Sequence, residues 1–481
     1  MVSETFEFYT KALGAMSSLG IARAGQKLQS IPHHFTYQAT PNPKNVVIIG
    51  GSYAGTRLAQ RLTETLPTGY RAVLIERNSH FNHFFVFPRF SVVKGKEEKA
   101  FIPYDNLAKS APAGIFEHIR DTATEITPNT VKLSSGVEVE YEYLTVATGS
   151  WQPAPSKYDV LTKNEGVNAF RATQRAVEAA KTIAVVGGGP VGVQIATDIK
   201  SYYPAKEVTL AHSRDKVLSA FGPRLQGVVM DALRKMGVGM MMGERPAIKK
   251  DAPGEGAGAG MVGPGSLTFK DGTQKSYDLV LPCTGQRPNS SILAQLAPGA
   301  IDPQTQQILV HPTLQINNGS KSSSDKEMNV SERIFSLGDV AKTGGPRFAR
   351  AARAQAEIVT SNILSLIRGQ KDKLSEYHPA MYEGAIKLTL GKSDYLFCGQ
   401  MPDGREIMKF GKTQPQNEDF EVQSAWEELG ARMNFAETEL GAGTEKMEKH
   451  KEKFNATWGQ GWGQGWEKNR DQQMPWQKRD A

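Results

Sequence analysis

The sequence predicts an α/β protein in which a unit of strand, glycine-rich turn and helix occurs twice. The first unit begins at Asn45, where the apolar run VVII breaks into GGSYAG and continues as a helical pattern. The second begins at Thr182 and reads TIAVVGGGPVGV. A composition of 39% hydrophobic and 22% charged residues over 481 positions suits a globular chain with two or three cores. Repetition of this unit therefore predicts two α/β domains.

The first glycine turn predicts a nucleotide site. Glycines let the backbone approach a pyrophosphate, and the N-terminus of the following helix offers it free N–H groups. The positions concerned are Gly50, Gly51, Ser52, Tyr53, Ala54 and Gly55, with Ser52 standing where the middle glycine is usual. The next apolar strand, AVLI, ends in Glu76. A carboxylate there suits an adenosine ribose without a phosphate, as in FAD or NAD.

The second glycine turn predicts a second dinucleotide. Gly187, Gly189 and Gly192 fill all three glycine places of the motif. The following strand carries no carboxylate at its end and is succeeded by Ser213 and Arg214, which could bind a 2′-phosphate, so NADPH is expected at least as much as NADH. The alternative is that Arg214 is an exposed turn charge. A chain that holds two dinucleotides is expected to pass electrons between them.

The cysteine count excludes one mechanism. Cys283 and Cys398 are the two cysteines of the sequence, and their separation excludes a CxxC or CxxxxC redox pair. The net charge of +7, from 57 basic and 50 acidic residues, is a mild excess without a basic and aromatic nucleic-acid module, so no nucleic-acid partner is expected. His80 and His83 lack further ligands nearby, so no metal site is expected either.

Both ends of the chain lie outside this pattern. Residues 1–44 form an N-terminal extension, in which Phe6, Tyr9, Leu13 and Met16 recur at helical spacing and predict an amphipathic helix from Ser3 to about Leu28. This helix could pack on the protein or make a peripheral membrane contact. Residues 251–265 read as a flexible glycine and alanine loop, and residues 416–481, with WGQGWGQGW, as a disordered low-complexity tail. The expected location is cytoplasmic or peripheral on an intracellular membrane, with mitochondria as an alternative.

Five motifs in one order carry a resemblance to a known family. They are GGSYAG, ATGS, GGGPVG, CTGQRPN and FSLGDVA. Together they resemble the two-dinucleotide-domain flavoproteins related to the pyridine-nucleotide disulfide oxidoreductases. The segments ERNSHFNHFFVFPR and KLTLGKSDYLFCG are most similar to the apoptosis-inducing-factor-like branch, which includes ferroptosis suppressors. The resemblance spans about residues 45–400.

The resemblance implies a three-layer, glutathione-reductase-like fold with two Rossmann-like domains. The first FAD segment would span 45–150, the NAD(P)H domain 151–282, the second FAD segment 283–370, and a small strand-bearing C-terminal unit 371–415. The first glycine turn and Glu76 would hold FAD, with further contacts from Arg89, from the backbone near Ala123 and from Asp339. Thr148 and Gly149 would lie at the crossing between the domains. The second glycine turn would hold NAD(P)H.

These features predict an FAD-dependent oxidoreductase that takes a hydride from NAD(P)H. Because an internal dithiol is missing, a diffusible small molecule must accept the electrons directly, and the resemblance favours a quinone. Oxygen or a biosynthetic intermediate remains open as acceptor, which includes the role of a tailoring enzyme for a specialised metabolite. A redox-sensing or death-signalling protein is the alternative outside enzymology. The oligomeric state is left open.

Overall fold

The structure is a computed structural model that describes residues 4–250, 263–319, 330–401, 403–412 and 422–433. Contacts group Met1–Ala431 into one compact unit, and all helices and strands below belong to it.

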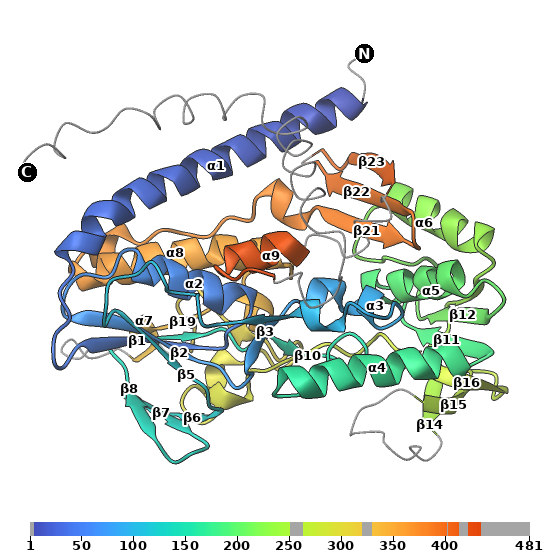
Figure 1. Cartoon of the computed structure of the whole chain (residues 1–481), viewed down its shortest axis with the longest axis horizontal. Helices are drawn as coiled ribbons and strands as arrows, with labels where there is room; N and C mark the ends of the chain where they lie inside the picture. Colours follow the sequence, from blue (N-terminus) through green and yellow to red (C-terminus); the bar gives the residue numbers. More distant parts are fainter. Residues whose placement is uncertain (1–3, 251–262, 320–329, 402, 413–421, 434–481) are drawn as a thin grey trace, which may run out of the picture. The chain divides into compact units, whose positions relative to one another are not determined.

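A five-stranded parallel sheet is the first layer, with strand order β19-β9-β1-β2-β5 (Figure 1). Its strands are β1 (Lys44–Ile49), β2 (Tyr70–Ile75), β5 (Phe116–Ile119), β9 (Tyr143–Val146) and β19 (Ile334–Ser336). β19 follows the second sheet in the sequence yet pairs with β9, so a late segment completes the first sheet. The predicted α/β class with Rossmann-like domains is confirmed, whereas the domain boundaries stay a prediction.

Side chains of β1 alternate between two apolar cores, as expected for a strand buried on both faces. Val46 and Ile48 pack with helices α2 (Tyr53–Thr63) and α8 (Ala349–Ile367). Val47 and Ile49 pack toward an antiparallel sheet of β6 (Ala123–Ile126), β7 (Thr130–Leu133) and β8 (Glu138–Glu140). The parallel sheet therefore lies between helices and a small second sheet, and the first glycine turn follows its central strand.

The second large sheet has six strands in the order β13-β12-β11-β16-β15-β14. They are β11 (Thr182–Val186), β12 (Glu207–His212), β13 (Gly239–Met242), β14 (Ala247–Lys250), β15 (Gly263–Thr268) and β16 (Gln274–Pro282). Helices α5 (Pro190–Tyr202) and α6 (Pro223–Lys235) belong to this half. The loop predicted at 251–265 needs a correction at its end, because β15 begins at Gly263 and pairs with β16. Residues 251–262 lie outside the described residues.

Helix α4 (Lys163–Ala179) leads into β11. Thr162 caps it, since its hydroxyl accepts a hydrogen bond from the Glu165 N–H at 3.3 Å while the Glu165 carboxylate accepts one from the Thr162 N–H at 3.0 Å. This capping box fixes the start of the helix.

The C-terminal region of the unit differs from the sequence prediction. An antiparallel sheet contains β21 (Ile386–Leu390), β22 (Asp394–Gln400) and β23 (Glu406–Lys412), within the segment predicted to bear strands. Helix α9 (Val422–Glu428) falls in the segment predicted to be disordered. The prediction is wrong there because Ala425 and Leu429 are buried in the first core and the Trp426 indole donates to the Lys99 carbonyl at 2.9 Å. The tryptophan and glycine repeat lies outside the described residues.

Short elements connect these layers. They are β3 (His80–Asn82), β4 (Phe101–Pro103), β10 (Ser150–Trp151), β17 (Arg287–Pro288), β18 (Ile308–Leu309), β20 (Ala341–Lys342), α3 (Phe87–Phe90), α7 (Val330–Arg333) and the 3₁₀ turns η1 (Phe84–Val86), η2 (Glu97–Ala100), η3 (Ser291–Leu293), η4 (Pro298–Ala300), η5 (Gly338–Val340), η6 (Lys371–Lys373) and η7 (Met381–Gly384). β10 and β17 pair antiparallel and mark the two places where the chain crosses between the large sheets.

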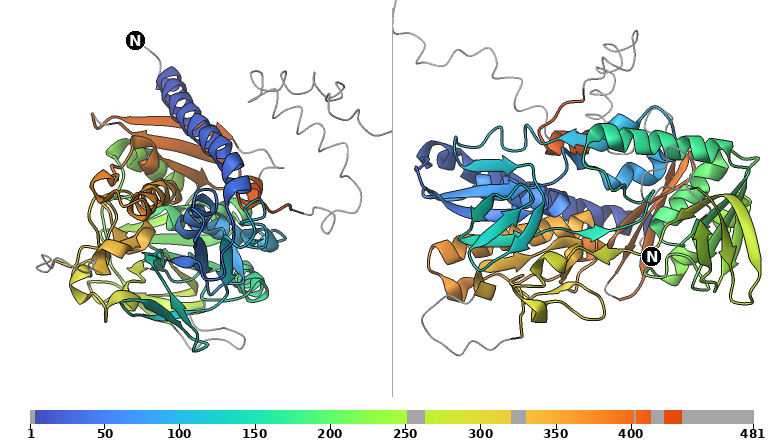
Figure 2. Two further views of the ribbon diagram at one scale, coloured as in Figure 1. Left: turned by 90° about the vertical axis from the view of Figure 1, so that its left-hand side faces the viewer. Right: turned by 90° about the horizontal axis from the view of Figure 1, so that it is seen from below.

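The N-terminal helix α1 (Glu4–Thr36) is longer than predicted and runs across the helical side of the first sheet (Figures 1 and 2). Its end is fixed to β2, because the Tyr37 hydroxyl donates to the Tyr70 carbonyl at 2.9 Å. The side chains of Phe6, Tyr9, Leu13 and Met16, on which the prediction rested, lie outside the described residues. None of the described helices combines the length and apolar character that crossing a bilayer requires.

Candidate active site

The first glycine turn is shaped by two contacts that exclude side chains. Gly50 has φ +104°, and a Cβ there would lie 2.5 Å from the Ala147 carbonyl oxygen. A Cβ at Gly55 would lie 1.8 Å from the Gly50 carbonyl oxygen. Both positions therefore need glycine, since α2 starts directly against the end of β1. Ser52 occupies the N-cap of α2 and its side chain makes no capping bond, so the substitution of the middle glycine leaves the turn intact.

Glu76 closes the turn from the end of β2. Its Oε2 accepts a hydrogen bond from the Gly51 N–H at 2.5 Å, and Oε1 accepts one from the Asn78 N–H at 2.8 Å. The Tyr104 hydroxyl donates to the Gly51 carbonyl at 2.7 Å. Burial raises the pKa of Glu76, since the charged form loses its hydration, while the two backbone N–H groups oppose this rise. A carboxylate is thus held beside the turn, as the ribose assignment requires.

Tyr53 and Ala54 form the first turn of α2. The Tyr53 hydroxyl lies 3.1 Å from His83 Nδ1, and the Tyr53 ring stands edge-on to Phe81 with centroids 5.0 Å apart. Ala54 is buried, and a Cβ on Gly338 would lie 3.4 Å from its Cβ. The start of α2 therefore contacts the rings of Phe81 and His83 and the turn η5. Burial lowers the pKa of His83 to about 3, so this histidine is neutral. In the described residues no cluster of three His, Cys, Asp or Glu side chains has the arrangement of a metal site.

The second glycine turn repeats the geometry of the first. Gly187 has φ +124°, and a Cβ there would lie 2.6 Å from the Cys283 carbonyl oxygen. A Cβ at Gly192 would lie 1.9 Å from the Gly187 carbonyl oxygen. Gly189 is the N-cap of α5, and a Cβ there would meet no atom within 4 Å, so open space lies before this helix start. Both turns thus have the narrow backbone approach that a pyrophosphate needs.

His212 takes the place in the second turn that Glu76 takes in the first. Val186 and Ala211 pair in register as Ile49 and Ile75 do, and the next residue is His212 or Glu76 respectively. His212 Nδ1 accepts a hydrogen bond from the Gly188 N–H at 3.1 Å. The sequence did not predict that His212 bonds to the glycine turn. The absence of a carboxylate at the end of this strand was the one sign that another residue takes its place. An imidazole here does not repel a 2′-phosphate as a carboxylate would.

Ser213 and Arg214 follow in the turn after β12. Ser213 is half-buried and Arg214 is exposed. The Arg214 carbonyl accepts from the Gly243 N–H at 3.0 Å, which holds the backbone of this turn to the end of β13. Burial lowers the pKa of His212 and the Arg214 charge lowers it further, so the guanidinium lies near this imidazole.

The two crossing segments are joined residue by residue. The Thr148 hydroxyl donates to the Asn289 carbonyl at 2.7 Å, and the Asn289 N–H donates to the Gly149 carbonyl at 3.0 Å. The Asn289 side chain donates in turn to the Thr148 carbonyl at 2.9 Å. Thr148 and Gly149 thus lie at the crossing, as predicted.

Asp339 is held by residues from both crossings. Its Oδ2 accepts from the Ser150 hydroxyl at 3.1 Å and from the Gln286 amide at 3.0 Å. The Lys157 ammonium donates to the Ser150 carbonyl at 2.7 Å and lies 4.5 Å from the centroid of the Phe84 ring. Burial lowers the pKa of Lys157, and the neighbouring Asp339 carboxylate partly offsets this effect. Ser150 and Gln286 belong to the motifs ATGS and CTGQRPN and could be found from the sequence, whereas Lys157 belongs to no motif.

Arg89 and Ala123 lie at different places from these turns. Arg89 Nε donates to Asp198 Oδ2 at 2.8 Å, and its Nη2 donates to the Gly391 carbonyl at 2.8 Å. These bonds join α3 to α5 and to the turn between β21 and β22, a structural role that the sequence did not predict. Ala123 is half-buried at the start of β6. Neither placement tests the predicted FAD contacts, which stay predictions.

The two cysteines are free thiols in different parts of the fold. Cys283 follows β16, and burial raises its pKa to about 12. Cys398 lies in β22, where burial and the Glu406 carboxylate raise its pKa to about 12. Thiolates are the reactive form of cysteine, so neither side chain is prepared for thiol chemistry at neutral pH.

Comparison with known proteins supports this arrangement. Residues 44–356 match the family model of the pyridine nucleotide-disulphide oxidoreductases. Fe-regulated protein 8 of Mycosarcoma maydis is 35% identical over 376 residues, which cover 72% of this chain and 87% of that protein. Human ferroptosis suppressor protein 1 is 28% identical over 400 residues, covering 80% and 95%. Apoptosis-inducing factor homolog B of Dictyostelium discoideum is 26% identical over 392 residues, covering 74% and 96%.

A solved structure shares the fold. The sulfide:quinone oxidoreductase of Aquifex aeolicus superposes with a TM-score of 0.62 at 19% identity, covering 82% of this chain and 94% of that one. The two glycine turns and the carboxylate at Glu76 fit the dinucleotides that this family binds, since the backbone leaves room where a side chain would block it. The chain therefore belongs to the pyridine nucleotide-disulphide oxidoreductase family, in its apoptosis-inducing-factor-like branch, and is an FAD-dependent NAD(P)H oxidoreductase.

Proposed function

We propose that this enzyme oxidises NAD(P)H and reduces a diffusible quinone, without a thiol relay. The balanced reaction converts NAD(P)H, one proton and a quinone into NAD(P)⁺ and a quinol. The observation that carries the proposal is the state of Cys283 and Cys398. Cys283 follows β16 of the second large sheet, Cys398 lies in β22 of the C-terminal sheet, both pKa values are raised, and the sequence has no further cysteine. Electrons therefore have no dithiol to reach before they leave the protein, and the likeness to the apoptosis-inducing-factor-like branch favours a quinone.

The first turn would hold FAD in this proposal. Gly50, Gly55 and the start of α2 would face its pyrophosphate, and Glu76 would accept hydrogen bonds from its adenosine ribose. Asp339, oriented by Ser150 and Gln286, would accept from hydroxyls of the ribityl chain. When bound, FAD supplies a two-electron carrier that accepts a hydride.

The second turn would hold NAD(P)H. Gly187, Gly189 and Gly192 would admit the pyrophosphate at the start of α5, and the end of β12 would contact the adenosine ribose. The crossing strands β10 and β17 would fix the two halves relative to each other, because hydrogen bonds join Thr148 and Gly149 to Asn289. The contribution of the protein is thus to orient the two dinucleotides and to exclude water, and no side chain is assigned as acid or base.

An acceptor screen tests the proposal. The full FAD-loaded chain is mixed with NADH or NADPH under anaerobic conditions, and NAD(P)H absorbance is followed after addition of a short-chain ubiquinone or of an aromatic disulfide. In a separate aerobic arm, dioxygen is the acceptor. We expect turnover with the quinone and one quinol formed per NAD(P)H. Turnover supported only by the disulfide or only by dioxygen would refute the quinone assignment.

A cysteine-free variant is the matched control. Cys283→Ser/Cys398→Ser keeps the size of both side chains, and we expect its quinone turnover to stay within about twofold of the wild type, since neither thiol is ionised. A variant that binds FAD normally but loses quinone turnover would show that a thiol takes part.

A further inference from the structure

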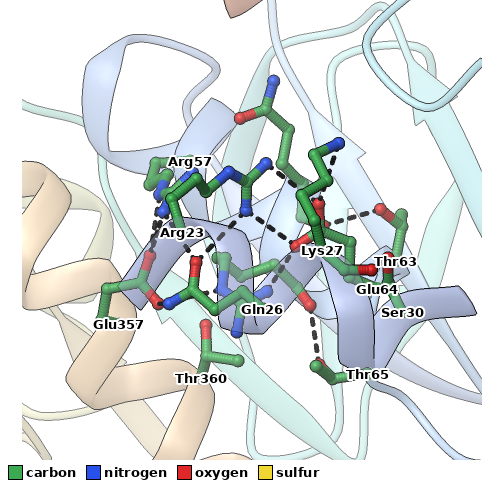
Figure 3. A network of polar contacts seen from close by, with 12 residues as sticks. Arg23, Gln26, Lys27, Ser30, Arg57, Thr63, Glu64, Thr65, Glu357 and Thr360 are labelled. Atoms are coloured by element: carbon green, nitrogen blue, oxygen red, sulfur yellow. Dashed lines mark hydrogen bonds and ion pairs between the residues drawn. The ribbon is translucent and has the colours of Figure 1, made fainter. Parts of the chain in front are cut away.

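One side of helix α1 is fixed to the body of the protein. Arg23 makes a two-point contact with Glu64, its Nη1 and Nη2 each lying 2.9 Å from a carboxylate oxygen. The Gln26 amide donates to Glu357 at 2.8 Å, and His33 Nε2 lies 2.7 Å from the Leu66 carbonyl oxygen. Figure 3 shows this network between α1, α2 and α8. Positions 23, 26 and 33 share one face of the helix, which is therefore the inner face.

The outer face of α1 carries a row of exposed apolar side chains. Ile21, Leu28, Ile31 and Phe35 are 69%, 68%, 56% and 80% exposed. Their spacing of seven, three and four residues places them in one row, on the side opposite to the contacts of Arg23, Gln26 and His33. Single exposed apolar residues need no explanation, but four in a row on one helix mark an interaction surface. We call Ile21, Leu28, Ile31 and Phe35 the α1 row.

The row is too narrow for a stable protein interface on its own. The four side chains together offer on the order of 400–500 Å² of apolar surface, which is below the roughly 800 Å² per partner of a standard protein interface. The row follows a convex helix over 14 residues, which corresponds to about 21 Å along the axis. A lipid bilayer can deform around such a narrow ridge and cover it more readily than a second protein does.

The charges of this region favour an anionic surface. The sequence has no Asp or Glu from Phe8 to Thr63, while six Lys and Arg residues lie in that stretch. Lys27, beside the α1 row, is 60% exposed although its ammonium lies 3.6 Å from Glu64 Oε1, and His34 is also exposed. The whole chain has a net charge of +7. From Ile21 to Phe35 the helix itself carries no acidic residue, and its acidic neighbours Glu64 and Glu357 lie on the inner face. A helix with an apolar outer row and no acidic residue in that stretch has the composition of an interfacial membrane helix.

We propose that the α1 row docks the protein on the surface of an anionic lipid bilayer, with α1 lying in the interface plane. Ile21, Leu28, Ile31 and Phe35 enter the headgroup and acyl boundary, and Lys27 faces lipid phosphates. The inner contacts of Arg23 and Gln26 stay in place, so the enzyme body is held close to the membrane. This inference does not depend on the identity of the electron acceptor.

Vesicle flotation of the full FAD-loaded chain tests the proposal. The probes are phosphatidylcholine vesicles with and without phosphatidylserine, at low and high salt. We expect the wild type to float with the phosphatidylserine vesicles and to bind them less at high salt, because screening weakens attraction to anionic lipid. Leu28→Ser/Phe35→Ser is expected to reduce the fraction of protein that partitions to these vesicles by about tenfold or more, since two large side chains leave the apolar phase.

A matched control separates the row from general surface hydrophobicity. Val137→Ser/Leu161→Ser removes two other exposed apolar side chains, 53% and 43% exposed, and is expected to float like the wild type. Flavin content and circular dichroism confirm that both variants are folded. Absence of wild-type flotation, or equal flotation of both variants, would overturn the proposal. A dimer in light scattering that Leu28→Ser/Phe35→Ser converts to a monomer, without vesicle binding, would overturn it in favour of a second copy of the chain.

Discussion

The guanidinium of Arg89 lies 2.8 Å from the carboxylate of Asp198, and the two residues are only 5% and 0% exposed. Arg89 belongs to α3, whereas Asp198 belongs to α5, which accompanies the second large sheet. A further hydrogen bond, from Arg89 to the Gly391 carbonyl, links this pair to the C-terminal sheet. One buried ion pair thus joins three parts of the chain that are far apart in sequence.

Removal of one partner of this pair should destabilise the fold. We expect Asp198→Ala to lower the free energy of unfolding by about 3–5 kcal/mol, because the Arg89 charge would stay buried without its carboxylate. The measurement is the urea midpoint of the FAD-loaded protein, with the slope of the transition checked for change. The control is Asp159→Ala, which breaks the exposed Arg77–Asp159 pair, 3.0 Å apart, and should cost less than about 1 kcal/mol. Equal midpoints for the two variants would show that the buried pair is not a structural link.

Gly55 should tolerate no side chain, since its Cβ would meet the Gly50 carbonyl oxygen at 1.8 Å. We expect Gly55→Ala to lose most bound FAD, because α2 must move away from β1 and widen the turn. The readout is flavin absorbance per protein after purification, together with the melting temperature. Gly227→Ala is the control, since Gly227 lies in α6 with no atom within 4 Å of an added Cβ. It should keep FAD and gain up to about 1 kcal/mol from the better helix propensity of alanine. Full flavin content in Gly55→Ala would contradict the geometry of the turn.

The parts of the site that could be predicted are those with local causes. A glycine turn between an apolar strand and a helix is specified by neighbouring residues. The sequence could therefore identify the positions where the backbone passes too close to a carbonyl oxygen for a side chain, which are Gly50, Gly55, Gly187 and Gly192. Glu76 was predictable for the same reason, since the last residue of a parallel strand points to the turn of its neighbour.

The parts that were missed depend on tertiary contacts. Helix α9 has no strong local pattern and is stabilised by burial of Ala425 and Leu429 under other elements. Arg89 carries no sign in the sequence that its partner is Asp198, more than one hundred positions away. Lys157 contacts the Ser150 carbonyl and the Phe84 ring because the chain folds back after β10, and no sequence motif predicts this fold-back.

His83 should make the folded state sensitive to acid. Burial lowers its pKa from the usual 6.5 to about 3, so the unfolded chain binds a proton at a higher pH than the folded chain does. The stability from neutral His83 is complete above pH 6.5 and is lost as the pH falls toward 3, with a slope of up to about 1.4 kcal/mol per pH unit. We expect His83→Gln to reduce this slope, since glutamine keeps an acceptor for the Tyr53 hydroxyl but does not titrate. Urea unfolding at several pH values between 7 and 4 measures it. His378→Gln, at an exposed position, should leave the slope as in the wild type, and an unchanged slope in His83→Gln would refute the assignment.

The last prediction concerns the choice of coenzyme. His212 leaves no carboxylate at the end of β12, and Arg214 stands exposed in the turn that follows. If Arg214 binds the 2′-phosphate of the coenzyme, Arg214→Ala should weaken NADP⁺ binding by about tenfold, because a charge-assisted contact is lost, and leave NAD⁺ binding within twofold. Titration of the FAD-loaded protein with each oxidised coenzyme measures both affinities without turnover. Lys216→Ala, which removes another exposed cation two residues on, controls for general loss of positive charge and should affect NADP⁺ less than Arg214→Ala does. Unchanged NADP⁺ affinity in Arg214→Ala would show that Arg214 is a solvated turn residue, and the imidazole of His212 would then be the remaining determinant at this strand end.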